Sequence, residues 1–244
     1  MNENETISPP VLILVLMTKQ ENSVFLKEVG QITSNYCKSD YLTLISKSVI
    51  ISLVLFSSQV FTYDERTKAI KEVLRKDLGQ TIIEISDPDA KIMGSDVLFT
   101  GREFFVGICE TSNEAGASAV AEAFPEFPCT PIKVSKGAQH LKKYITVAGP
   151  DILCVGASKE AKEMLKRMER EATFSYQTLS VTEDEAANCL YINGTLIHRA
   201  IEEIPESFKV FCEKIDFARR SICFSELANI STGLSACSLL VRKS

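Results

Sequence analysis

What this 244-residue sequence lacks already narrows its function. It has no tryptophan and only two histidines, so metal sites built from several histidines are nearly excluded. Lysine and arginine number 27 against 32 aspartates and glutamates. The net charge of -5 leaves no basic excess to bind a phosphate backbone, and nucleic acid is not an expected partner.

The spacing of the cysteines excludes two common kinds of cysteine site. None of the eight forms a Cys-x-x-Cys pair, which argues against a zinc ribbon or a thioredoxin-type redox motif. Most lie in apolar runs, as Cys154 does, and we interpret them as buried, reduced thiols of a cytoplasmic protein. The apolar stretches 11–17 and 49–61 are shorter than the ~20 residues that span a bilayer. We expect both to be buried strands without membrane contact, with a membrane anchor as the alternative.

Several catalytic and nucleotide-binding motifs are missing. The sequence contains no G-x-x-x-x-G-K-[ST] loop, no G-x-G-x-x-G after a strand and no G-x-S-x-G elbow. The pair that remains for catalysis is a cysteine with a histidine. His140 stands at a predicted loop-to-strand junction, and Cys237 stands between small residues before a terminal apolar run. Alone, each residue is weak evidence for catalysis.

What the sequence does contain is a repeat. Two apolar runs at 96–100 and 104–108 flank a turn and predict a hairpin. A helix is expected at 113–124, where apolar residues recur at helical spacing, and a strand at 130–134. The order strand, strand, helix, strand then recurs twice, with elements predicted at 141–147, 152–156, 159–171 and 178–181, and at 187–192, 195–198, 205–215 and 221–224.

The ends of the chain fit this repeat less well. A helix at 66–78 and a strand at 81–85, with a possible hairpin before them, suggest a fourth copy. The strand predicted at 234–241 could complete a unit that begins near the N-terminus. Repeats of this size predict an α/β propeller, a ring of blades whose first blade is altered or incomplete. An open α/β sandwich is the alternative, and a doubly wound parallel sheet is disfavoured because hairpins alternate with helices.

One string gives the sequence a family resemblance. The residues DVLFTGREFFVG at 96–107 closely resemble dimethylarginine dimethylaminohydrolase, a member of the guanidine-modifying, or pentein, superfamily. Further matches follow in the same order, namely HLK at 140–142, AGP at 148–150, AANC at 186–189, LIHR at 196–199, PES at 205–207 and SEL at 225–227. On this basis we divide the chain into a divergent N-terminal segment, 1–62, and a pentein-like propeller domain, 63–244.

The resemblance implies an activity. The family hydrolyses asymmetric dimethylarginine and monomethylarginine to citrulline and a methylamine, without a cofactor or a metal, and thereby relieves inhibition of nitric oxide synthesis. A thiolate attacks the guanidinium carbon, and a histidine protonates the departing amine before it activates water. Arginine deimination, a sister activity in the superfamily, is disfavoured by the string at 96–107.

The same resemblance assigns site residues. His140 matches the general acid/base, and Ile230 and Arg66 are the expected substrate-binding residues. Aligned without gaps, Ala236 falls on the nucleophile position, whereas a shift of one residue makes Cys237 the nucleophile. We name Cys237, because it is the only thiol in the closing strand.

Some family features have no counterpart here. The arginine that binds the substrate carboxylate falls on Thr111, and the Glu-Asp pair that grips the guanidinium is not found. A family member with impaired catalysis, which binds a ligand or a partner, is therefore the second hypothesis.

Overall fold

The computed structural model describes residues 81–224 and 233–242, together with the short segments 11–15, 17–18, 24–25, 43–45, 48–51, 72 and 74–76. Side chains are described at 72, 74–76, 81–224 and 233–235. No helix in these parts of the chain is long and apolar enough to cross a membrane.

The chain has an α/β fold built from a repeated unit. In each of the three units between residues 97 and 222, two antiparallel strands are followed by a helix and a third strand, parallel to the second. The first unit contains β7 (Val97–Phe99), β8 (Phe104–Ile108), α2 (Glu114–Ala123) and β9 (Cys129–Lys133). The second contains β10 (Ile145–Gly149), β11 (Ile152–Val155), α3 (Lys159–Glu171) and β12 (Gln177–Ser180). The third contains β13 (Leu190–Ile192), β14 (Thr195–Arg199), α4 (Pro205–Lys214) and β15 (Ala218–Ile222).

Strands from the two ends of the chain extend this pattern. Upstream, β4 (Thr43–Ile45) pairs antiparallel with β5 (Ser48–Ile51), which pairs parallel with β6 (Thr81–Glu84). Farther upstream, β2 (Met17–Thr18) pairs with β3 (Val24–Phe25). The strand β1 (Val11–Val15) pairs antiparallel with β16 (Ser238–Arg242). The prediction that the last strand joins one near the N-terminus is confirmed.

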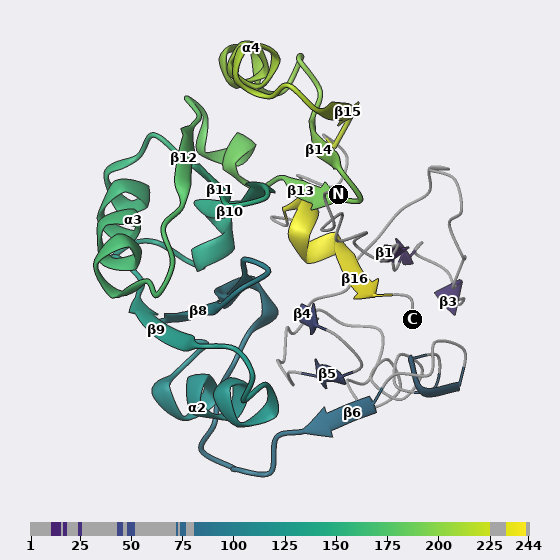
Figure 1. The fold of residues 1–244 in the computed structure, drawn as a ribbon, viewed down its shortest axis with the longest axis vertical. Helices are drawn as coiled ribbons and strands as arrows, with labels where there is room; N and C mark the ends of the chain where they lie inside the picture. The colour runs from purple at the N-terminus through teal and green to yellow at the C-terminus, as the bar shows by residue number, and fades with distance from the viewer. Residues whose placement is uncertain are drawn as a thin grey trace, which may run out of the picture.

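Figure 1 shows the units following one another clockwise, from β6 at the bottom through α2 and α3 to α4 at the top. The first strands of neighbouring units are in contact: β4 with β7, β7 with β10, and β10 with β13. β16, drawn in yellow inside this arc, contacts β4. The separate sheets exclude the doubly wound parallel sheet.

The predicted repeat is confirmed, with several local corrections. The strand expected from 187 begins at 190, because residues 184–187 form a 3-10 turn. Residues 141–143 form a 3-10 turn, η2 (Leu141–Lys143), so the strand expected from 141 begins at 145. Residues 234–237 likewise form the 3-10 turn η4 (Leu234–Cys237) before β16. The strand expected at 221–224 lies instead at 218–222, as β15. Its residues, ARRSI, are mostly exposed and polar, so an apolar pattern could not predict where it begins.

Alternate residues of the inner strands pack into different cores, which explains their almost continuous apolar sequences. Phe104 and Val106 of β8 pack against α2 of their own unit. Phe105, between them, packs into the core of the next unit, with Leu153 and Met164. The first two units therefore each bury one face of their sheet beneath their own helix and the other against the next unit.

Local signals set the ends of the helices. Asn113 caps α2 by accepting a hydrogen bond from the backbone N–H of Gly116, and Ser158 caps α3 through Ala161 in the same way. Helix α4 begins with Pro205, and its N-terminal amides are satisfied from outside the helix. The carboxylate of Glu183 accepts from the backbone N–H of Glu206 and of Ser207.

Gly116 tests this packing. A Cβ at this position would lie 2.1 Å from the carbonyl oxygen of Lys91, which is backbone and cannot turn away. We expect Gly116→Ala to lower the free energy of unfolding by about 2 kcal/mol, measured by urea denaturation. Ser118→Ala, at an exposed position of the same helix, should change it by less than about 0.5 kcal/mol. Equal midpoints for the two variants would contradict this packing.

Candidate active site

Short 3-10 turns lead into the first strands of the units and bring the site together. They are η1 (Gly94–Asp96) before β7, η2 before β10, η3 (Asp184–Ala187) before β13 and η4 before β16. Turn η1 contacts η2 and η4, and η2 contacts η3. Residues at these turns are therefore neighbours, although they are far apart in the sequence.

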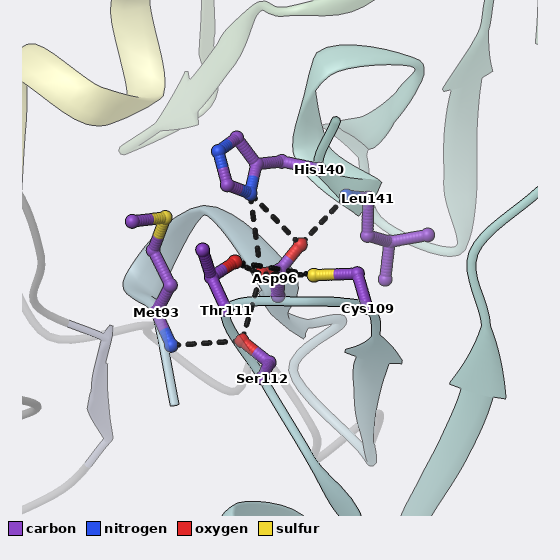
Figure 2. A network of polar contacts seen from close by, with 7 residues as sticks. All are labelled: Met93, Asp96, Cys109, Thr111, Ser112, His140 and Leu141. Carbon is purple, nitrogen blue, oxygen red and sulfur yellow. Dashed lines mark hydrogen bonds and ion pairs between the residues drawn. The ribbon is translucent and has the colours of Figure 1, made fainter. Parts of the chain in front are cut away.

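Asp96, the last residue of η1, is fully buried and is the centre of a polar network. Figure 2 shows its carboxylate surrounded by donors from two other segments. The hydroxyl of Ser112 donates to it at 2.7 Å, and the backbone N–H of Leu141 at 3.0 Å. The Thr111 hydroxyl and the Cys109 thiol also donate, both at 3.3 Å. A buried carboxylate is stable only with such partners.

His140, which precedes η2, turns one ring nitrogen toward this carboxylate. Its Nδ1 lies 3.2 Å from Oδ2 of Asp96, and its other ring nitrogen points away from the network (Figure 2). Burial lowers the pKa of His140, but hydrogen bonds and charge attraction from Asp96 and Cys109 outweigh burial and raise this pKa to about 9. At neutral pH the ring is an imidazolium, oriented by Asp96 and able to donate a proton from its outer nitrogen.

Cys109 and Ser112 are site residues that the sequence analysis did not single out. Cys109 follows β8 and is half-buried beside His140. The matched string at 96–107 ends two residues before Cys109. Only the fold brings Cys109 close to His140. Thr111, where the family pattern has a substrate-binding arginine, is uncharged and donates to Asp96 instead.

Asp96, Cys109 and His140 also make up a possible metal-ligand set. They offer one oxygen, one sulfur and one nitrogen, all within 4.8 Å of one another, and such a mixture suits Zn²⁺. Both carboxylate oxygens of Asp96 already accept hydrogen bonds. A metal ion would therefore have to displace the protons that Cys109 and His140 share with this carboxylate.

Lys142, in η2, is a further titratable group that interacts with Asp96. Burial lowers the pKa of its ammonium group to about 8, although the negative charge of Asp96 opposes this shift. A fraction of this side chain is therefore neutral near physiological pH.

The structure places some of the predicted site residues and not others. His140 lies in the network just described. The backbone of Cys237 ends η4, the turn that contacts η1, while its side chain lies outside the described residues. Arg66 and Ile230 also lie outside them. His198, the second histidine of the chain, is buried and stacks on Phe211.

Comparison with known proteins supports the resemblance. A human protein named "Putative hydrolase DDAH2" is 34% identical over 173 residues, which make up 68% of this chain and 60% of that protein. The Bos taurus protein of the same name is 32% identical over 173 residues. The chain belongs to the dimethylarginine dimethylaminohydrolase family. It spans about 60% of the length of these relatives. No family model matches it.

Solved structures agree with this family at the level of the fold. The dimethylarginine dimethylaminohydrolase of Pseudomonas aeruginosa, in a variant complexed with citrulline, matches 82% of this chain and 74% of its own with a TM-score of 0.62 and 18% identity. The inosamine-phosphate amidinotransferase StrB1 of Streptomyces griseus matches with a TM-score of 0.63 and 14% identity, over 86% of this chain and 68% of its own. At these identities the likeness shows the α/β fold alone.

The two histidines should titrate on opposite sides of their ordinary pKa of 6.5. His140 should titrate near 9, and His198 below 6.5, because burial lowers the pKa of His198 more than its hydrogen bond to the Arg199 carbonyl raises it. NMR titration of the ring protons measures both, and His140→Gln assigns the signals. Two overlapping curves near 6.5 would contradict the buried network.

The His140–Asp96 pair should also make stability depend on pH. The pKa of His140 is higher in the folded than in the unfolded chain, so its contribution is fully present below pH 6.5 and is lost as the pH rises through about 9. The loss should be about 3 kcal/mol in the free energy of unfolding at most. Denaturation between pH 6 and 10 measures it as the difference in slope between the unaltered protein and His140→Gln, because Lys142, whose pKa is lowered by burial, contributes an opposite slope to both.

Proposed function

We propose that this chain hydrolyses N-methylated arginines to citrulline and a methylamine through a covalent mechanism, with Cys237 as nucleophile and His140 as general acid and base. The observation that supports it is the buried carboxylate of Asp96, which orients His140 and raises its pKa, and which belongs to η1, the turn that contacts η4. We also propose that the units form a propeller ring of pentein type, and that the protein is cytoplasmic.

The chemistry follows from this arrangement. The thiolate of Cys237 attacks the guanidinium carbon, forming a C–S bond. His140, charged at neutral pH, then gives its outer proton to the departing amine as the C–N bond breaks. The neutral ring next removes a proton from water, which attacks the same carbon. Breakage of the C–S bond releases citrulline and returns the sulfur as thiolate.

Asp96 serves both halves of this cycle. While His140 is charged, the carboxylate stabilises it and keeps Nδ1 turned inward, which leaves the outer nitrogen for the substrate. The same carboxylate accepts from the backbone N–H of Leu141, so the turn that carries the ring is fixed together with the ring. An oriented base of this kind is the general pattern for activated thiol nucleophiles.

A second candidate is ligand binding with little turnover. It is favoured by Thr111, which is uncharged where the family pattern has an arginine for the substrate carboxylate, and whose hydroxyl is engaged with Asp96. A substrate carboxylate would lose a charge-assisted pair at this position, which costs roughly 1.5–3 kcal/mol. This loss predicts weak binding of arginine derivatives and slow hydrolysis.

Citrulline release from asymmetric dimethylarginine tests the proposal. We expect His140→Gln and Cys237→Ser each to lower the rate by roughly a hundredfold or more, because each removes a reacting group. Cys212→Ser, which changes an exposed thiol on α4, should leave the rate unchanged. Dimethylarginine that binds in calorimetry without citrulline release would favour the second candidate.

Labelling with chloroacetamidine, a cationic amidine that carries a leaving group, tests the nucleophile directly. If Cys237 faces the substrate, its thiolate should displace chloride rapidly, and dimethylarginine should protect it. Mass spectrometry of the labelled peptide identifies the residue. If Ala236 occupies the nucleophile position instead, Cys237 should resist labelling, because successive side chains of a 3-10 turn point about 120° apart. Ala236→Cys should then gain reactivity.

A further inference from the structure

Asn188 occupies the same place in its unit as the residues assigned to catalysis occupy in theirs. Asp96 ends η1, His140 directly precedes η2, and Cys237 ends η4. Asn188 directly follows η3. Each of the turns that lead to a first strand therefore has one such residue at its end or directly beside it, and Asn188 is the one without an assigned role.

We propose that Asn188 is a positioning residue, which holds the turn carrying Cys237 against the turn carrying His140. This inference rests on the proposed function for the roles of Cys237 and His140. The hydrogen bonds that join the two turns are all made by Lys142, Asn188 and Ser235, whose atoms the structure describes.

The contacts of Asn188 form a bridge between the two turns. Its Nδ2 donates to the backbone carbonyl of Lys142, at 2.6 Å, and to the hydroxyl of Ser235, at 2.8 Å. Its Oδ1 accepts from the backbone N–H of Ser235 at 2.9 Å. Because the Ser235 amide can only donate, it fixes which end of the carboxamide is oxygen. Lys142 is two residues from His140, and Ser235 is two residues from Cys237.

The bridge is buried and fits closely. Asn188 is 6% exposed, so water competes little for its hydrogen bonds. The backbone at Gly233 passes directly over the carboxamide, and a Cβ there would lie 2.4 Å from Cγ and 2.6 Å from Nδ2 of Asn188. The turn before Cys237 can therefore approach Asn188 only because residue 233 is glycine.

Such a bridge matters because the thiol and the imidazole come from different units. Their separation is set by how η2 and η4 dock, and a displacement of about 1 Å can cost on the order of a hundredfold in rate. The carboxamide supplies that docking with hydrogen bonds in three directions, whereas an apolar contact would fix only the distance.

A double-mutant cycle with Asn188→Ala and Gly233→Ala tests the proposal. Each single change should displace η4. We expect kcat to fall by roughly tenfold or more with KM changed less, and alkylation of Cys237 by iodoacetamide to change its rate and its pH dependence. The double variant should be no worse than Asn188→Ala alone, because removal of the carboxamide makes room for the Cβ at 233. If the losses in kcat caused by the two single changes multiply in the double variant, the two residues act independently and the proposed bridge is wrong.

Ser207→Ala is the matched control. Ser207 is fully buried and accepts hydrogen bonds from the backbone N–H of Thr182 and of Glu183, so it joins α4 to the start of η3 and does not bridge η2 and η4. The Ser207→Ala variant should have a lower melting temperature, but its kcat and the rate of Cys237 alkylation should be unchanged. If Asn188→Ala behaves in the same way, Asn188 is merely structural and the proposal is wrong.

The outcomes separate this inference from the proposed function. If the unaltered protein releases no citrulline, the function fails, but the coupling in Cys237 alkylation still decides whether Asn188 docks η4. If the unaltered protein is active and Asn188→Ala keeps its kcat and its alkylation rate, the inference fails and the function stands. Should Asn188→Ala not fold, Ser235→Ala removes one of the three hydrogen bonds and should give the same changes in smaller measure.

Discussion

The carboxylate of Asp96 is the group on which the arrangement of the site depends. A charge buried this fully is costly unless it is paired, and here it is paired from three directions. Donors at Ser112 and at Leu141 tie the exit of β8 to the turn before β10. Because the same oxygens orient His140, the interaction that joins two units also sets the protonation of the ring.

The repeated unit explains why the site lies where it does. The first two units each bury one face of their sheet under their own helix and the other against the next unit, so the first strands are held side by side. The short turns before these strands are then brought into contact without any long-range motif in the sequence. Catalytic groups at these turns need no loops of unusual length to reach one another.

Much of this fold could be predicted from the sequence. The hairpin expected at 96–108 forms as β7 and β8, and the helices expected at 113–124 and 159–171 form as α2 and α3, because their apolar spacing matches the faces that they bury. The 3-10 turns and β15 could not be predicted, because tertiary contacts rather than apolar periodicity stabilise them. His140 came from family resemblance, whereas Cys109 and Asn188 gained their roles only through contacts between units.

The pairing of β1 with β16 has a consequence for the order of folding. Turn η4, which carries Cys237, leads directly into β16, and β16 pairs with a strand that is far away in the sequence. Closing so long a loop costs more chain entropy than pairing strands within one unit, so we expect the three units between residues 97 and 222 to form before η4 docks. The turn that carries the candidate nucleophile is then the last part of the site to be placed.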